Sequence, residues 1–421
     1  MDINKLLEGV NCECGKHHDC AISYVYVEDD AMRHLPEVLT GYERVLLVAD
    51  ENTYSAAGER TESYVSSKIV DRVIFTGKTV LIPNEASIDA VSARCEGIDY
   101  ILGIGSGVIQ DLCKYVSKTT GITYGVVATA PSMDGYASSG AAMITDGMKV
   151  TYSAGVPHAI VADTDVIRNA PLEMIKAGYG DIIGKYSALN DWKLSREING
   201  EYFCQYIYDL TMDMLNATLP LADKLLKRDA ESVGILMEAL IVVGIAMSFA
   251  GNSRPASGSE HHLSHYFEIT GIVDGTEYLP HGIDVLYSTY VTSLIREKLS
   301  GLDFPREKFV MEEPLYESEI RRVYKSVADG CMELQRKLGA YERDLLPIYL
   351  EKQAQLKEIL RETPPAQRIK ELIEGIGLDL KDFYATYGEE RIKDAVKYAK
   401  ELKDRYTVLW MYYDMFGTKE I

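Results

Sequence analysis

Six short apolar runs, with helical or loop segments between several of them, constrain the fold of this chain more than any other feature. The first run, VLLVAD, ends in an acid, as a buried parallel strand would. Strands that alternate with helices form βαβ units, so the pattern predicts a parallel sheet that is covered on both faces. The six runs are Val45–Asp50, Ile69–Phe75, Thr79–Ile82, Tyr100–Ile104, Thr123–Ala128 and His158–Asp163.

The sequence changes character near Asn169–Pro171, because helical periodicity dominates beyond that point. We therefore expect an α/β domain over residues 1–168 and an all-α domain over residues 169–421. The chain of 421 residues is 47% apolar and long enough for two separate cores. Its longest apolar run, Leu240–Ala250, is too short to span a bilayer and predicts a buried helix.

Three other segments have predicted structures. AAMITDGMKVTYSA, from Ala141 to Ala154, predicts a hairpin that turns at Asp146-Gly147. Residues 331–362 form a charged helical stretch, which we expect to be a surface helix or a subunit contact. Residues 391–415 predict a last amphipathic helix.

Charge and cysteine content exclude several classes of partner. The formal net charge of −20 would repel nucleic acid and anionic membranes. Seven cysteines without a repeated spacing and an N-terminus without an apolar signal core predict a cytoplasmic protein with no membrane insertion. Cys12, Cys14, His17, His18 and Cys20 are dense enough for a zinc site, but no second cysteine pair completes one.

A glycine-rich loop, GIGSGVIQDLCK, covers Gly103–Lys114 between a predicted strand and a predicted helix. Its glycines would let the backbone approach a pyrophosphate, and the helix start offers amides and a positive dipole end. A simple tight turn is the alternative. Asp50, at the end of the first strand, is a candidate for the ribose hydroxyls, which would favour NAD over NADP, or for a helix cap.

A loop of small residues, ATAPSMDGYASSGA, covers Ala128–Ala141. It follows a predicted strand, at the end where open α/β sheets bind their ligands. Asp134 is the loop's only acid and can hold a substrate hydroxyl, although an Asp-Gly turn is the alternative. Further candidates for cofactor binding in this loop are Thr129, Ser132 and Ser138.

Residues 251–281 contain four of the chain's eight histidines. Ser259 is expected to cap a helix that begins near Glu260. The spacing of four would then place His261 and His265 on one face of that helix.

The other two histidines are expected to lie differently. His262 should point away from that face, whereas His281 opens a second predicted helix and can face a cleft. Two imidazoles from two helices begin a divalent-metal site but lack a third ligand. Asp181, within GYGDIIGKY, can supply that ligand and leave positions open for water or substrate. Capping and core histidines are the alternative.

Five motifs, taken together, carry a resemblance to known proteins. Over roughly residues 45–290 they occur in the order GxGSGxxxD, APSMDGYASSGA, GYGDIIGKYSALNDW, NSRPASGSEHHLSH and PHG. This ordered set resembles the superfamily of iron-containing alcohol dehydrogenases, glycerol dehydrogenases and dehydroquinate synthases. Within it, SMDGYAS and SRPxSGSEH are similar to the sn-glycerol-1-phosphate dehydrogenase family.

The resemblance implies a dehydroquinate synthase-like fold, with an N-terminal Rossmann-like nucleotide-binding domain, a C-terminal helical domain and a catalytic metal. It also implies roles for single residues. The metal ligands would be Asp181, His261 and His281, and the metal would be zinc, nickel or iron. The second active-site histidine would be His265, and Asp134 would contact the substrate. The dinucleotide loop would contain Gly105, Ser106, Gly107 and Asp111.

The activity that the resemblance implies is a metal-dependent, NAD(P)-linked interconversion of dihydroxyacetone phosphate and sn-glycerol 1-phosphate, with a place in phospholipid biosynthesis. Arg254 and Lys185 are our candidates for binding the phosphate, although a structural arginine is the alternative. We also expect a homo-oligomer. A polyol dehydrogenase, a sugar-phosphate cyclase of the dehydroquinate synthase type and a non-enzymatic metal-bound scaffold are the alternative functions.

Overall fold

The computed structural model describes residues 3–77, 81–145 and 148–418. Contacts divide the chain into two compact units, whose boundary lies later than the one predicted after residue 168. The chain passes from the first unit to the second, returns once, and then completes the second unit. The first unit is Met1–Ile182 with Asp213–Asn252, and the second is Ile183–Met212 with Ser253–Ile421.

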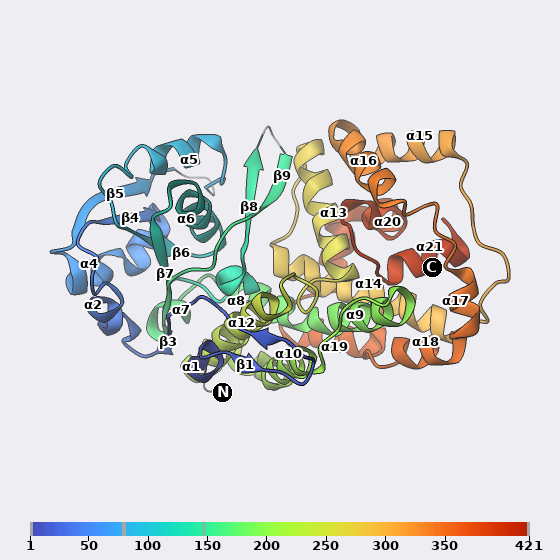
Figure 1. Ribbon diagram of the computed structural model, residues 1–421, viewed down its shortest axis with the longest axis horizontal. Helices are drawn as coiled ribbons and strands as arrows, with labels where there is room; N and C mark the ends of the chain where they lie inside the picture. Colours follow the sequence, from blue (N-terminus) through green and yellow to red (C-terminus); the bar gives the residue numbers. More distant parts are fainter. Residues whose placement is uncertain (1–2, 78–80, 146–147, 419–421) are drawn as a thin grey trace. The chain divides into compact units, whose positions relative to one another are not determined.

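A six-stranded sheet forms the centre of the first unit, and every pair of neighbouring strands in it is parallel (Figure 1). The strand order is β3-β10-β7-β6-β4-β5, so the direction of winding reverses between β4 and β6. The strands are β3 (Tyr24–Glu28), β4 (Val45–Asp50), β5 (Ile69–Phe75), β6 (Tyr100–Gly105), β7 (Thr123–Ala128) and β10 (Ala159–Asp163).

The two faces of this sheet bury separate clusters of side chains. In β4, Val45, Leu47 and Ala49 belong to one cluster, whereas Leu46 and Val48 belong to the other. Helices cover both clusters, as expected of βαβ units. Over the first cluster lie η1 (Ala31–His34), α2 (Leu35–Val38), α4 (Glu59–Val65) and α7 (Thr164–Ile167); over the second lie α5 (Glu85–Ser92) and α6 (Gly107–Thr120).

Five of the six predicted strands are confirmed. The remaining predicted strand, Thr79–Ile82, falls partly outside the described residues. Its described part, Leu81 and Ile82, is not in a strand. The edge strand β3 was not predicted, because only Val25 in it is fully buried and its sequence, YVYVE, is not a continuous apolar run. Edge strands need less apolar sequence than central ones, so periodicity gives them a weaker signal.

The predicted hairpin is confirmed as the antiparallel pair β8 (Gly140–Thr145) and β9 (Met148–Ser153). Its turn, predicted at Asp146-Gly147, lies outside the described residues. A shorter antiparallel pair near the N-terminus consists of β1 (Val10–Asn11) and β2 (His17–His18).

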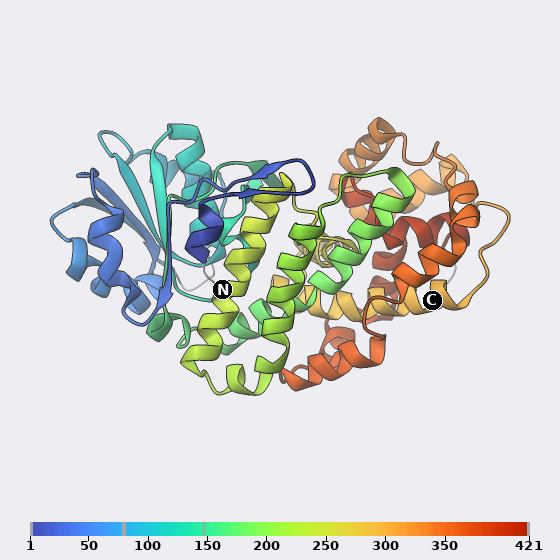
Figure 2. The same ribbon diagram turned by 60° about the horizontal axis from the view of Figure 1, so that its bottom comes forward.

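The predicted buried helix is also confirmed, as the end of the longer helix α12 (Ala230–Ala250), which begins after the N-cap Asp229. This helix is long and apolar enough to cross a membrane, but 78% of its most apolar window is buried within the protein. Since core helices pass the same test, it is weak evidence for a span. Figure 2 shows β1 and β2 in dark blue beside α12 in yellow-green.

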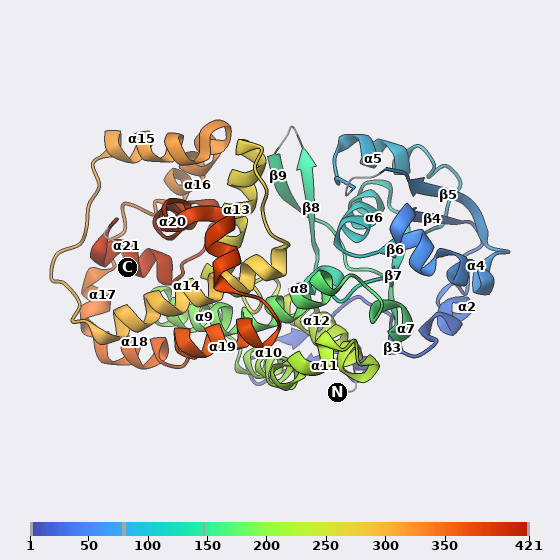
Figure 3. The same cartoon turned by 180° about the vertical axis from the view of Figure 1, so that it is seen from behind.

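The second unit consists of helices, so the predicted pairing of a Rossmann-like α/β unit with a helical unit is confirmed. Its centre is α14, which packs against α13, α18 and α19 (Figure 3). The principal helices are α9 (Lys185–Asn199), α13 (Ser259–Asp274), α14 (His281–Gly301), α15 (Glu313–Tyr324), α16 (Ala328–Leu338), α17 (Leu346–Glu351), α18 (Gln353–Leu360), α19 (Ala366–Gly375), α20 (Leu380–Tyr398) and α21 (Val408–Phe416).

Two predicted segments of this unit are divided. Residues 331–362 are helical but interrupted after α16, where Gly339 has a φ of +59°. The single helix predicted over residues 391–415 is wrong, because α20 ends at Tyr398 and α21 begins at Val408. In the 3-10 turn between them, the buried Lys400 and Glu401 form hydrogen bonds with Tyr341.

Candidate active site

A cavity of about 1390 Å³ lies in the first unit, at the carboxyl ends of β4, β6 and β7. Asp50, Ser106 and Thr129, three of the predicted cofactor residues, line it. The cavity lies where the direction of winding reverses, between β4 and β6. Open α/β sheets bind ligands at such a position, so the cavity is a suitable site for a nucleotide.

The glycine-rich loop joins β6 to α6 at this cavity. Gly105 ends the strand, and a Cβ atom there would lie 2.5 Å from Cβ of Ile109, so glycine is needed for this close approach. Among the described residues, no side chain caps the start of α6 after Ser106. Its first amides can therefore bind an anion such as a pyrophosphate, as Gly107 opens the helix. Asp111, one turn further on, lies 3.5 Å from Nζ of Lys114.

Asp50 caps a helix, one of its two predicted roles. Its Oδ1 atom accepts hydrogen bonds from the backbone N–H groups of Asn52 at 2.8 Å and Thr53 at 2.9 Å. In the opposite direction, the hydroxyl oxygen of Thr53 accepts a hydrogen bond from the Asp50 N–H at 3.0 Å. This capping box is confirmed, and because Asp50 also lines the cavity, the ribose contact stays a prediction.

The loop that contains Asp134 is held from two sides. Its 3-10 turn, η3 (Asp134–Ala137), packs against α12. The buried Asp134 donates its backbone N–H to Oδ2 of Asp181, at 2.9 Å. Asp181 lies near the end of α8 (Leu172–Ile183) and is fully buried, as expected of a residue with a partner or a ligand role.

Helix α6 supplies the second support of this loop. Nζ of Lys114 donates to the carbonyls of Gly135 at 3.1 Å and Gly140 at 2.7 Å, and burial lowers the pKa of this lysine. The hydroxyl of Ser138 donates to the same Gly135 carbonyl at 3.0 Å, so this predicted cofactor residue is part of the loop's own structure. Ser132 lies in the same loop, between β7 and η3.

Three of the four clustered histidines meet in the second unit. The ring centroids of His261 and His281 lie 5.1 Å apart, and those of His265 and His281 lie 5.4 Å apart. One ligand atom each of His265, Glu268 and His281 lies within 4.8 Å of the other two. His262 is fully buried and, within the described chain, neither of its ring nitrogens has a hydrogen-bond partner. That His262 points away from the face of its neighbours stays a prediction.

Hydrogen bonds orient two of these rings. Nδ1 of His261 lies 2.6 Å from Oε1 of Glu260, and Nδ1 of His281 lies 3.3 Å from the hydroxyl of Ser264. A proton held on Nδ1 places the lone pair on Nε2, which is the usual arrangement of metal-binding histidines. Burial, with nearby cations, lowers the pKa of His261 well below its ordinary value, so the ring is neutral. Neutral imidazoles suit zinc, nickel and iron.

The start of α13 is fixed by a buried ion pair. The Ser259 N–H donates to Oδ2 of Asp191 at 2.6 Å, and Nη2 of Arg296 donates to Oδ1 of the same carboxylate at 2.8 Å. The prediction that Ser259 caps this helix is wrong, because Gly258 is the N-cap and Ser259 is the first helical residue. The carboxylate of Asp191 takes the place of a capping side chain, since it accepts an N–H of the first turn.

The two residues predicted to bind the phosphate form hydrogen bonds with other groups of the protein. Nη1 of the buried Arg254 donates to the Tyr406 carbonyl at 2.8 Å, while Nε and Nη2 bind Glu201. Nζ of Lys185 donates to the carbonyl of Ala256 at 3.1 Å. The structural alternative for Arg254 is thus supported, and phosphate contacts of both residues stay predictions.

Arg405 is a cation of the same region that the sequence analysis missed. Its Nη1 atom donates to the Ser257 carbonyl and its Nη2 atom to the Ser253 hydroxyl, both at 2.9 Å. Burial, with the charge of Arg254, lowers the pKa of Arg405 to about 10. No sequence signal marks this residue, because it lies about 150 residues after the loop that it binds.

Comparisons with known proteins agree with this geometry. Residues 26–171 match the family model of iron-containing alcohol dehydrogenases. The sulfoacetaldehyde reductase from Bifidobacterium kashiwanohense in complex with NAD+ is 13% identical, with a TM-score of 0.60 that covers 96% of this chain and 98% of that chain. The alcohol dehydrogenase from Oenococcus oeni is 15% identical, with a TM-score of 0.59 over 92% of this chain and 94% of that chain. The chain therefore has the fold of the iron-containing alcohol dehydrogenases.

Closer relatives define the family within this class. The glycerol-1-phosphate dehydrogenase (NAD(P)+) from Halalkalibacterium halodurans is 30% identical over 95% of this chain and 94% of its own length. The protein of the same name from Bacillus licheniformis is 30% identical over 94% of this chain and 90% of its own length. The chain belongs to the glycerol-1-phosphate dehydrogenase family.

Proposed function

We propose that this chain is an NAD(P)-dependent oxidoreductase that interconverts dihydroxyacetone phosphate and sn-glycerol 1-phosphate. The observation that carries this proposal is the similarity to glycerol-1-phosphate dehydrogenases over nearly the full chain. The cavity of the first unit and the histidine cluster of the second unit agree with it. In the reducing direction, C2 of the ketone gains a hydride and its oxygen gains a proton.

In this proposal Asp181, His261 and His281 hold one divalent metal, which is zinc, nickel or iron. The support is the donor chemistry: two imidazoles oriented by hydrogen bonds in the second unit and a fully buried carboxylate in the first. When bound, the metal supplies Lewis-acid polarisation of a substrate oxygen. The hydrogen bond from the Asp134 N–H to Oδ2 of Asp181 fixes the orientation of this carboxylate.

The cavity residues Asp50, Ser106 and Thr129 would hold the dinucleotide, together with the amides after Gly105. The pyrophosphate would bind at the start of α6, and the Asp50 carboxylate would accept hydrogen bonds from the ribose. The nicotinamide supplies the hydride chemistry.

The substrate would be held by residues from the remaining motifs. Asp134 would accept a hydrogen bond from a substrate hydroxyl, and His265 would give a proton to the C2 oxygen or remove it. Arg254 or Lys185 would contact the phosphate, with Arg405 as a further cation beside the same loop. We further propose a cytoplasmic homo-oligomer that acts in phospholipid biosynthesis.

An absorbance assay of NADH tests the proposal. The full-length protein is stripped with a chelator, reloaded separately with zinc, nickel and iron, and given dihydroxyacetone phosphate or unphosphorylated dihydroxyacetone. We expect metal-dependent loss of NADH with the phosphate ester only, and sn-glycerol 1-phosphate in a chiral analysis of the product. Loss of NADH with the free ketone alone would instead identify a polyol dehydrogenase. No net loss with either ketone would favour a cyclase, because a cyclase regenerates its cofactor in each turnover.

A further inference from the structure

The N-terminal hairpin holds two cysteines and a histidine that the proposed reaction does not use. The Cys12 N–H donates to the Lys16 carbonyl, and the Gly15 N–H donates to the Cys12 carbonyl, both at 3.0 Å. Gly15 has a φ of +86°, the left-handed region that favours glycine. This tight turn joins β1 to β2 and places Cys12 and Cys14 on one short loop.

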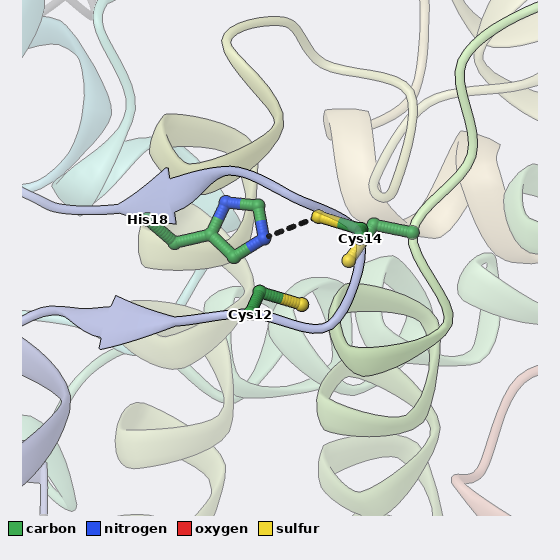
Figure 4. Close-up of side chains that lie close together, drawn as sticks. Cys12, Cys14 and His18 are labelled. Carbon is green, nitrogen blue, oxygen red and sulfur yellow. Dashed lines mark hydrogen bonds between the residues drawn. The ribbon is translucent and has the colours of Figure 1, made fainter.

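The side chains of Cys12, Cys14 and His18 converge (Figure 4). One ligand atom of each lies within 4.8 Å of the other two. Sγ of Cys14 lies 3.4 Å from Nε2 of His18. A sulfur and a nitrogen bound to one tetrahedral zinc ion lie about 3.5 Å apart, given the usual Zn–S and Zn–N bond lengths. The separation therefore matches that of two ligands of a single ion.

A hydrogen bond fixes the orientation of His18. Its Nδ1 atom donates to the carbonyl of Phe249, at the end of α12, over 3.1 Å, and its ring stacks on the Phe249 ring. The lone pair is then on Nε2, which faces Cys14. A backbone carbonyl on the other ring nitrogen is a common support of metal-binding histidines. His18 is also only 1% exposed, so the ring has little freedom to turn.

The neighbouring histidine and cysteine do not share this arrangement. His17 is exposed, and its Nδ1 atom lies 2.9 Å from Oδ1 of Asn11. Cys20 is buried, and burial raises the pKa of its thiol, which opposes the thiolate form that binds metals. Of the five cysteines and histidines in this segment, the structure therefore supports only Cys12, Cys14 and His18 as potential metal ligands.

We propose that Cys12, Cys14 and His18 bind a structural zinc ion that is distinct from the metal of the proposed active site. Both thiols lose their protons to solvent on binding, and the two negative charges balance the ion. Water or one further side chain completes the tetrahedron. Because His18 also binds the Phe249 carbonyl, the ion fastens the N-terminal hairpin to the end of α12.

Cobalt tests this site independently of enzyme activity. The full-length protein is kept reduced, stripped with a chelator and titrated with Co²⁺ without oxygen. We expect a sulfur-to-cobalt charge-transfer band in the near ultraviolet that saturates between one and two equivalents, because the proposed active site competes for the ion, with an intensity that matches at least two thiolates. The proposed active site has only carboxylate and imidazole ligands, so it gives no such band. The result therefore stands or fails apart from the proposed function.

Matched variants assign the band to single residues. We expect Cys12→Ser, Cys14→Ser and His18→Ala to lose or weaken it strongly, and His17→Ala and Cys20→Ala to retain it. His261→Ala should retain it as well, because that histidine belongs to the other proposed site. Absence of the band in the unaltered protein, or its persistence in the Cys12→Ser/Cys14→Ser double variant, would overturn the proposal.

A measurement of zinc content tests the proposal even if the cysteine variants do not fold. Elemental analysis of the unaltered protein, loaded with zinc and freed of excess ion, should give two equivalents per chain. The variant His261→Ala/His281→Ala should keep one of the two. Loss of all zinc from that variant, once circular dichroism shows that it is folded, would contradict a second site.

Discussion

The guanidinium of Arg254 binds the carboxylate of Glu201 through two hydrogen bonds, 2.7 Å from Nε and 2.5 Å from Nη2. The arginine side chain is only 3% exposed. Breaking a buried pair leaves a charge without its partner, so we expect Arg254→Met to lower the free energy of unfolding by about 3 kcal/mol. Urea unfolding measures the change.

An exposed pair provides the control for this prediction. Arg196 lies 2.8 Å from Glu197, and its side chain is 39% exposed. Arg196→Met should therefore cost about 1 kcal/mol or less. An equal loss of unfolding free energy in the two variants would show that the Arg254 pair does not stabilise the fold. If Arg254→Met instead raised the KM for the phosphate ester without a loss of stability, the arginine would be assigned to substrate binding.

The same pair predicts how stability depends on pH. Burial raises the pKa of Glu201, but hydrogen bonds from Arg254 and Ser195 outweigh it, so the pKa lies below its ordinary value. A carboxyl group of this kind stabilises the fold above its unfolded pKa of about 4.3, and this contribution is lost as the pH falls through the folded pKa. In urea unfolding at a series of pH values, Glu201→Gln should therefore lose stability less steeply in acid than the unaltered protein.

Glu260 is expected to position His261, a proposed metal ligand, without touching the substrate. Partners on the second nitrogen of a ligating histidine contribute about 10- to 100-fold in metal affinity, so Glu260→Gln should weaken binding by about that factor. Competition with a zinc-sensitive dye measures the affinity of the chelator-stripped protein. His281→Ala, which removes a proposed ligand itself, should weaken binding more. An unchanged affinity in Glu260→Gln would show that the 2.6 Å contact has no role in metal binding.

Two substitutions separate the roles of Asp50. Asparagine caps helices about as well as aspartate, so Asp50→Asn should leave the free energy of unfolding nearly unchanged. Removal of the charge should nevertheless weaken NADH binding about tenfold or more, since hydrogen bonds to charged groups contribute about 1.5–3 kcal/mol. Quenching of protein fluorescence measures the dissociation constant. Asp50→Ala should lose about 1 kcal/mol of stability in addition, and unaltered binding in both variants would leave the residue as a cap only.

His262 should tolerate an apolar side chain, in contrast to its neighbour. It is fully buried, and in the described part of the chain both ring nitrogens lack a hydrogen-bond partner. Replacing such a group with a similar apolar volume is neutral or stabilising, so His262→Leu should unfold at the same temperature or higher. Burial lowers the pKa of His262, and the fold therefore loses stability as the pH falls below about 6.5. Part of that loss should be absent from the variant in calorimetry at pH 5 and pH 8.

The extent to which the sequence predicted the fold follows from where each interaction lies along the chain. Central strands such as β4 were predictable, because burial on both faces requires a continuous apolar run. The edge strand β3 has no such requirement. The start of α13 at Ser259 was predictable only approximately, because its capping carboxylate, Asp191, lies 68 residues from Ser259. Arg405 was missed for the same reason, since contacts between distant segments leave no local pattern.

Because η3 packs against α12, the first unit can be completed only after α12 has been synthesised. The turn that carries Asp134 is synthesised about a hundred residues before the helix that covers it. Since a ribosome releases the N-terminal part first, the nascent chain presents an incomplete first unit while the segment up to Met212 is translated. The apolar surface of the first unit that α12 later covers is exposed during that interval. A chaperone that binds apolar surfaces would find its target there, before residue 250 has emerged.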